Sequence, residues 1–251
     1  GHPHRAGVCY AAAEIAMKTI GLLGGMSWES TVTYYQIINE AVREKLGGLH
    51  SARCVLYSVD FAEIESMQHE GRWEDAAQCL VTAGQGLERA GAELVVLCTN
   101  TMHKLADTIQ AGLRVPFLHI ADATALQIKK AGLRRVGLLG TRFTMEEDFF
   151  GGRLAGRFNL DTLVPDALGR EEVHRVIYEE LCVGLIRPES RNRLHRIMTR
   201  LAEHGAEGVI LGCTELGMLV GKDDSPVPLF DTTRIHALAA VDSALQPEDG
   251  A

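Results

Sequence analysis

One segment of this 251-residue chain repeats another, and the repeat restricts the fold more than any other feature. Residues 91–97, GAELVVL, match residues 205–211, GAEGVIL, without a gap at an offset of 114. Two further matches follow in the same order: IGLLGG at 20–25 with VGLLGT at 136–141, and Val115-Pro116 with Val227-Pro228. Three landmarks in one order indicate two related halves, which can enclose a ligand between them.

Short apolar runs alternate with segments whose apolar residues have helical spacing. The runs predicted as strands are 19–25, 54–60, 94–100, 116–121, 135–141, 161–165, 208–214 and 227–232. The segments predicted as helices are 31–46, 73–90, 122–131, 171–183 and 190–204. Strands that are apolar throughout and separated by helices are typical of parallel sheets covered on both faces. We therefore expect an α/β fold with two similar, pseudo-twofold related domains, each a parallel sheet flanked by helices, with the active site in the cleft between them.

The repeat also suggests where the domains divide. We expect a first α/β domain at 17–117 plus 230–246 and a second at 118–229. Residues 1–16 precede Met17 and lack the long apolar core of a signal peptide, so we interpret them as an upstream extension or a cloning remnant.

Composition excludes several classes of partner. The formal net charge is -8, which argues against nucleic acid or an anionic membrane as a partner, and no apolar run has the length of a membrane helix. Hydrophobic residues make up 46% of the chain, enough for a well-filled core. The six cysteines are scattered and form no Cys-x-x-Cys pair, a usage typical of reduced thiols in a cytoplasmic protein.

The repeat sets polar residues of the two halves opposite each other where the apolar runs end. Its register places Thr99 opposite Cys213 and Cys98 opposite Gly212. The next pairs in the same register are Asn100 with Thr214, and Thr101 with Glu215. Successive side chains of a strand point to opposite faces, so Cys98 should pack in the core if Thr99 faces the cleft. Cys213 is therefore the candidate working thiol.

The segments GLLGGMSWES, NTMHK, LLGT and LGCTELGML resemble the aspartate/glutamate racemase superfamily, in particular its cofactor-independent amino-acid racemases. The resemblance extends from Met17 to about Leu245. In that superfamily two cysteines face each other across a cleft between two α/β domains, one directly before Asn-Thr and the other in Gly-Cys-Thr-Glu. Here Thr99 stands directly before Asn100-Thr101, so the first thiol is replaced by a hydroxyl.

Racemisation removes a proton from one face of the α-carbon and returns one to the other. A protein site can lower the pKa of a thiol by several units, so a thiolate is a feasible base, whereas a threonine hydroxyl is too weak an acid for that role. The resemblance implies that Cys213 abstracts the α-proton of L-aspartate or L-glutamate and that reprotonation occurs on the Thr99 side. No pyridoxal-lysine signature or metal-ligand cluster stands out, and we expect no cofactor and no metal.

The resemblance also suggests substrate contacts. Backbone N–H groups with Asn100, Thr101 and Thr214 are expected to hold the α-carboxylate, and Glu215 the ammonium group. Further candidates are Met26 in the Gly-rich turn, Gln68 after the second strand and Thr141 at the end of VGLLGT. Cys182 occupies the place of a lysine that grips the side-chain carboxylate in typical aspartate racemases, which weakens the case for an acidic substrate.

Other functions stay open at this point. A broad-specificity racemase is the nearest alternative, and single-thiol relatives in the superfamily include decarboxylases of substituted malonates and isomerases of maleate. A two-lobed clamp that only binds a small acid is a third class, although binding does not require a thiol. The family also suggests a homodimer that acts on a small amino acid.

Overall fold

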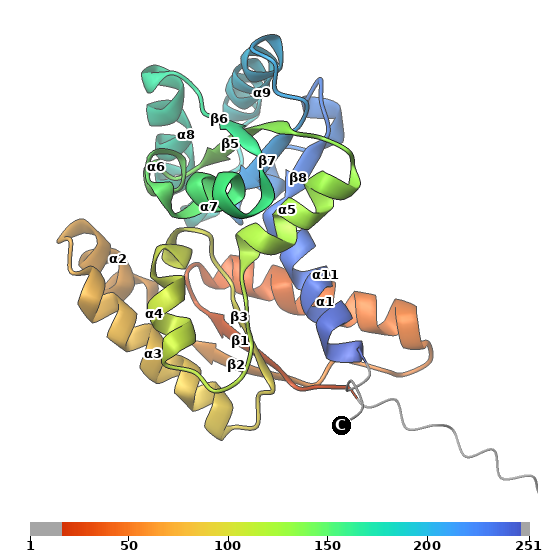
Figure 1. The fold of residues 1–251 in the computed structure, drawn as a ribbon. Helices are drawn as coiled ribbons and strands as arrows, with labels where there is room; N and C mark the ends of the chain where they lie inside the picture. The colour runs from red at the N-terminus through yellow and green to blue at the C-terminus, as the bar shows by residue number, and fades with distance from the viewer. Residues whose placement is uncertain (1–16, 247–251) are drawn as a thin grey trace, which may run out of the picture.

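The computed structural model describes residues 17–246 and shows two α/β lobes stacked end to end (Figure 1). The first parallel sheet contains β1 (Ile20–Gly24), β2 (Cys54–Ser58), β3 (Leu94–Leu97) and β4 (Phe117–Leu118). The second contains β5 (Arg135–Gly140), β6 (Asp161–Leu163), β7 (Val209–Gly212) and β8 (Leu229–Asp231). The strand orders are β2-β1-β3-β4 and β6-β5-β7-β8, so the predicted α/β fold with two similar parallel sheets is confirmed. The predicted extension 1–16 lies outside the described residues.

Helices cover both sheets. Those of the first half are α1 (Trp28–Leu46), α2 (Phe61–His69), α3 (Trp73–Arg89), η1 (Thr101–Leu105) and α4 (Ala106–Ala111). Those of the second half are α5 (Ile120–Lys130), α6 (Arg142–Glu146), α7 (Asp148–Phe158), α8 (Ala167–Glu179), η2 (Leu181–Val183), α9 (Pro188–Glu203), α10 (Leu216–Leu219) and η3 (Lys222–Asp224). The last helix, α11 (Thr232–Leu245), packs back against the first lobe.

The strand registers show that the sequence repeat is a structural repeat. Gly21 pairs with Val95 in the first sheet, and Gly137 pairs with Val209 in the second. Val95 in turn pairs with Phe117, just as Val209 pairs with Leu229. Each pair of the second sheet is the repeat mate of the pair in the first, so the ends of β3 and β7 occupy equivalent places.

Several boundaries differ from the prediction for local reasons. The predicted strands end two or three residues too late at 94–100 and 208–214, because the polar residues there leave the sheet and turn into η1 and α10. The predicted helix 171–183 ends at Glu179, and η2 then closes at Gly184 in a left-handed conformation that favours glycine.

Helix α11 links the two lobes. It follows β8 of the second sheet and then packs its alanines, including Ala237, Ala240 and Ala244, into the core over the first sheet (Figure 1). The predicted domain boundaries at 117/118 and 229/230 fall inside β4 and β8. The division into 17–117 plus 230–246 and 118–229 remains a prediction.

Short connections after the strands bring polar residues to the interface between the lobes. Gly25 has a φ of 96°, and a Cβ there would meet the carbonyl oxygen of Val59, so only glycine fits this turn. Ser27 then caps α1, and Thr141 caps α6 in the second lobe. Parallel sheets present their carboxyl ends at one edge, and the two edges face each other here.

Candidate active site

A small enclosed cavity lies between the carboxyl ends of the two sheets. Its volume of about 30 Å³ is room for about two water molecules. The lining residues are Met26, Phe61, Gln68, Thr99, Asn100, Thr101, Thr141, Ile177, Tyr178, Cys182, Cys213, Thr214 and Glu215. Every site residue predicted from the sequence is in this set, and Phe61, Ile177, Tyr178 and the nearby Cys182 complete it.

The two strand-end cysteines have different surroundings. The side chain of Cys213 lines the cavity, and its Sγ lies 3.0 Å from Oε2 of Glu215. Cys98 is fully buried on the other face of β3, in the core cluster that contains Tyr34 and Val241. The expectation that Cys98 packs in the core is confirmed, since the strand alternation points its side chain away from the cavity.

The surroundings of Cys213 favour the protonated thiol. Burial raises the pKa of Cys213 well above its usual value, and the neighbouring Glu215 carboxylate raises that pKa further. The backbone N–H of Glu215 hydrogen bonds to the sulfur and acts in the opposite direction. The lowered thiol pKa considered from the sequence is therefore not found in this closed cavity, because burial and a like charge outweigh one N–H group.

Four side chains surround the Glu215 carboxylate. Oε1 accepts hydrogen bonds from Ser27 Oγ at 2.6 Å and Ser30 Oγ at 2.5 Å. Oε2 accepts from Thr214 Oγ1 at 2.7 Å and from Cys213 Sγ. Ser30 Oγ also lies 2.7 Å from Thr214 Oγ1, and its single proton can serve only one of these two acceptors. An ionised carboxylate has about four acceptor sites, so at least three of them are occupied by Ser27, Thr214 and Cys213. Both serines come from the start of α1 in the first lobe, where Ser27 also caps the helix, and neither was among the site residues predicted from the sequence.

Asn100 presents an unpaired acceptor to the cavity. The hydroxyl of Thr232 donates to the carbonyl of Leu211 at 2.8 Å, so this hydroxyl can only accept from Asn100 Nδ2, 3.0 Å away. That contact fixes the orientation of the amide. Oδ1 is buried and has no hydrogen-bond partner among residues 17–246. An unsatisfied buried acceptor costs about 1–3 kcal/mol, so a donor on a bound molecule would be stabilised here.

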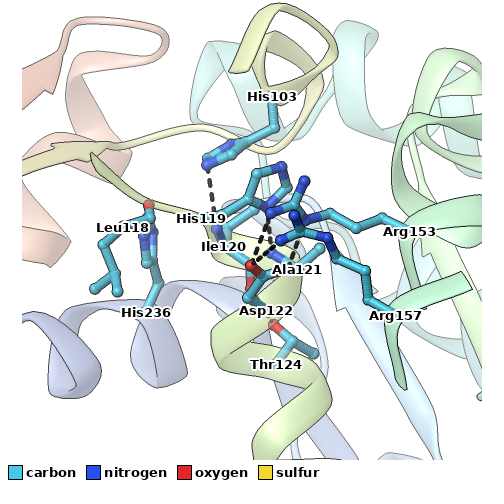
Figure 2. Close-up of polar contacts among 10 residues, drawn as sticks. All are labelled: His103, Leu118, His119, Ile120, Ala121, Asp122, Thr124, Arg153, Arg157 and His236. Carbon is cyan, nitrogen blue, oxygen red and sulfur yellow. Dashed lines mark hydrogen bonds and ion pairs between the residues drawn. The ribbon is translucent and has the colours of Figure 1, made fainter. Parts of the chain in front are cut away.

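A buried imidazole supports the Thr99 side of the cavity. The N–H of Ile120 donates to Nε2 of His103 at 3.2 Å, so the proton of this ring is on Nδ1, which donates to the carbonyl of Thr99 at 2.7 Å. Figure 2 shows His103 directly above the segment that leads from the first lobe into α5. His103 thereby ties the end of β3 to the start of the second lobe.

Two more histidines pack against His103 beside the segment that leads into α5 (Figure 2). His119 caps α5 by accepting from the N–H of Ala121, and His236 bonds through Nε2 to the carbonyl of Leu118 at 2.8 Å. Burial lowers the pKa of His119 to about 3 and that of His236 to about 4, and it lowers the pKa of His103 as well. The rings are uncharged at neutral pH and bond to backbone groups, which indicates a structural role for these histidines.

The outer wall of the cavity joins the two lobes. Tyr178 of α8 donates to Oε1 of Gln68 on α2 at 3.4 Å, and Gln68 is 5% exposed. Beyond this pair lies a surface pocket of about 830 Å³. At the rim, Lys104 of the first lobe pairs with Glu147 of the second at 2.6 Å. These contacts hold the cleft closed.

Residues 17–246 contain neither a membrane-spanning helix nor a metal-binding cluster. No helix in this part of the chain is long and apolar enough to span a membrane. Within the same range, no group of three or more His, Cys, Asp or Glu side chains has an arrangement that could hold a metal ion.

Two matched parallel-sheet lobes meet at a cavity lined by two thiols and a buried carboxylate, which is the layout of an α/β enzyme with its site between two lobes. Residues 23–240 match the model of the family described as Asp/Glu/hydantoin racemase, and the chain belongs to that family. The superfamily predicted from the strand-end motifs is thus confirmed.

Solved structures support this assignment. A putative Asp/Glu racemase from Yersinia pestis is 55% identical with a TM-score of 0.86, and the match covers 92% of this chain and 100% of that one. An aspartate racemase homologue from Pyrococcus horikoshii is 39% identical with a TM-score of 0.79, at 92% and 100% coverage. The broad specificity amino-acid racemase RacX of Bacillus subtilis is 23% identical over 90% of this chain and 98% of its own length. The curated relative is named an amino-acid racemase, which is an isomerase, and the two solved structures are named a putative racemase and a racemase homologue.

Proposed function

We propose that the protein is an amino-acid racemase that works without pyridoxal phosphate, and that Cys213 removes the α-proton of an L-amino acid. Reprotonation occurs on the Thr99 side. One observation carries the proposal: Thr99 and Cys213 are repeat mates on facing strand ends, and both line the same closed cavity. A substrate held between them would present opposite faces of its α-carbon to the two side chains.

Glu215 makes the thiol usable as a base. The S–H group already points at Oε2, so its proton passes to the carboxylate and leaves a thiolate. The thiolate takes the α-proton, and the electron pair of the C–H bond moves into the α-carboxylate as an enolate. Water on the Thr99 side then donates a proton to the opposite face. Transfer of the proton from Glu215 to the resulting hydroxide restores the resting site.

The α-ammonium group binds at Asn100 Oδ1, the buried acceptor that lacks a partner within residues 17–246. This differs from the sequence-based expectation, which gave the ammonium to Glu215 and the α-carboxylate partly to Asn100. The side chains of Ser27, Ser30, Thr214 and Cys213 already surround the Glu215 carboxylate, whereas Asn100 Oδ1 has no partner in the described part of the chain. The α-carboxylate is left to the hydroxyls of Thr101 and Thr141, which lie 3.0 Å apart across the cleft, and to nearby N–H groups.

A cavity of about 30 Å³ is too small for an amino acid, so binding must open the cleft. The contacts that have to yield are the Gln68–Tyr178 hydrogen bond and the Lys104–Glu147 ion pair at the rim. Closure over the substrate would then exclude water from the carbanion.

Exchange of the α-proton tests the proposal. In deuterated water the wild-type protein should incorporate deuterium into an L-amino acid and form the D enantiomer, and Cys213→Ser should lower the rate by about 1000-fold or more. Cys182→Ala is the matched control, because it removes the other cavity thiol and should retain exchange. Exchange that survives in Cys213→Ser, or carbon dioxide release from a substituted malonate without racemisation, would exclude this mechanism.

The sequence-based expectations for the substrate were L-aspartate or L-glutamate, with broad specificity as the alternative. Relatives of both kinds match the chain, and the two hypotheses differ in what the substrate side chain meets inside the cavity. The expected homodimer is also a prediction, which light scattering of the purified protein tests.

A further inference from the structure

We infer that the cavity selects L-amino acids with neutral side chains over L-aspartate and L-glutamate. This inference depends on the proposed racemase function and names the substrate class of that site. The reason is the charge of the wall: Glu215 is its one charged side chain, and no lysine, arginine or histidine is among the lining residues.

Cys182 lies on the cavity wall near Glu215, where a cation could meet a side-chain carboxylate. Burial raises the pKa of this thiol, and the Glu215 carboxylate raises it further, so the group is uncharged. A neutral thiol is a weak donor and offers no charge to balance an acid.

The arginines beyond the Gln68–Tyr178 wall belong to the outer pocket. Arg170 and Arg175 line that pocket, where they are engaged with Glu146 and with Glu172 and Glu180 respectively. Arg142 is exposed and also lines the outer pocket. Gln68 and Tyr178 form the cavity wall on this side, so these guanidinium groups do not line the closed cavity.

An acidic side chain would therefore be buried beside Glu215 without a cation. Burying a charge without a partner is unfavourable, and a second carboxylate nearby adds repulsion. The positive charge of the substrate's ammonium group is already balanced by the substrate's own α-carboxylate. An acidic substrate leaves two negative charges in the closed chamber, whereas a neutral one leaves the single charge of Glu215.

The same wall suits a neutral polar side chain. The amide nitrogen of Gln68 is spent on the thioether sulfur of Met102 at 2.9 Å, a weak acceptor. Its amide oxygen receives only the long 3.4 Å contact from Tyr178. A substrate hydroxyl or amide would give both groups stronger partners, and Met26, Phe61 and Ile177 supply apolar surface for the carbons.

Isosteric substrate pairs test the inference on the wild-type protein. L-Asparagine and L-aspartate, and L-glutamine and L-glutamate, share a shape and differ in charge. We expect kcat/KM for α-proton exchange to be higher for the amide of at least one pair by about tenfold or more, and for neither acid to exceed its amide. Equal or faster exchange of the acids would overturn the inference and leave the racemase function standing. Absence of exchange with any amino acid would instead overturn the racemase function.

A charge-gain variant provides an independent measurement. Cys182→Lys should raise the ratio of aspartate to asparagine exchange by about tenfold, because it places a cation on the wall. Cys182→Met fills similar space without charge and should leave that ratio unchanged. An unchanged ratio in a folded Cys182→Lys protein would contradict the inference, and the substrate pairs decide the question if that variant does not fold.

Discussion

The ends of β3 and β7 have the same backbone plan and different chemistry. At β3 the side chain facing the cavity is the hydroxyl of Thr99, and an imidazole holds its carbonyl. At β7 it is the thiol of Cys213, which donates a hydrogen bond to the Glu215 carboxylate. The repeat gives the two strand ends equivalent positions beside the cavity, while the base that we propose belongs to the second lobe alone.

The supports behind these strand ends differ in the same way. The repeat mate of His119, which caps α5, is Asp231, which caps α11. The mate of His103 is Gly217, where a Cβ would meet the Asp231 carboxylate at 2.8 Å. Neutral rings in tilted and edge-on contact therefore lie behind the end of β3, and the half-buried Asp231 carboxylate takes the equivalent place behind the end of β7.

The imidazole side should be sensitive to acid. Histidines of the unfolded chain take up protons below about pH 6.5, whereas the three buried rings stay neutral in the fold, so the unfolded state binds more protons. The free energy of unfolding should fall by about 4 kcal/mol between pH 7.5 and 5.5, and continue to fall towards pH 4. Urea denaturation at the two pH values measures this.

A His119 variant tests the contribution of one ring to this pH dependence. His119→Asn keeps a side-chain cap for α5 and removes one titrating ring, so about a third of the loss should disappear. The raised pKa of Asp231 acts with the opposite sign, because burial favours its protonated form. Both proteins keep Asp231, so the difference between them isolates the ring of His119. A stability that does not change with pH would show that the rings are not buried and neutral.

On the thiol side, Glu215→Gln tests the proton acceptor. The amide keeps the size of the side chain but cannot take the proton of Cys213, so kcat for exchange should fall by about 100-fold. Glu179→Gln on the exposed rim is the matched control and should not change kcat. A Glu215→Gln protein with normal kcat would show that the thiol ionises without the carboxylate.

Restoring the missing thiol should make the two sides more alike. Thr99→Cys places a base on the first strand end, and turnover of the D enantiomer should rise by at least about tenfold if Thr99 faces the substrate. Because the enantiomers have equal free energies in water, kcat/KM must remain equal in both directions, and the gain appears in kcat for D with a matching change in KM. Unchanged D turnover would place position 99 out of reach of the α-carbon.

The smallest effect is expected at Cys98. Cys98→Ala removes a sulfur from the core over the first sheet, so unfolding should become easier by about 1 kcal/mol while exchange kinetics stay the same. Thermal denaturation and the exchange assay on one preparation measure both. A large loss of activity with normal stability would mean that Cys98, and not the Thr99 face, belongs to the site.

Sequence reasoning located the strand ends because the repeat fixed which residues are mates, and strand alternation then separated Cys98 from Thr99. It did not find Ser30, since the contact with Glu215 joins residues 185 positions apart through an inter-lobe contact. It also missed helices α2, α7 and α11. The upward shift of the Cys213 pKa depends on burial and on the position of the Glu215 carboxylate, and a sequence motif encodes neither.

The hydrogen-bonded series from Asn100 through Thr232 to the Leu211 carbonyl joins the end of β3, the first turn of α11 and β7. A rotation of one lobe relative to the other must either keep these hydrogen bonds intact or break them. The Asn100 side chain, which we propose binds the amino group, therefore also connects the two lobes. A bound ligand would fix the orientation of the amide, and a fixed amide would resist separation of the lobes. The affinity for the amino group and the residence time of the ligand would then rise or fall together.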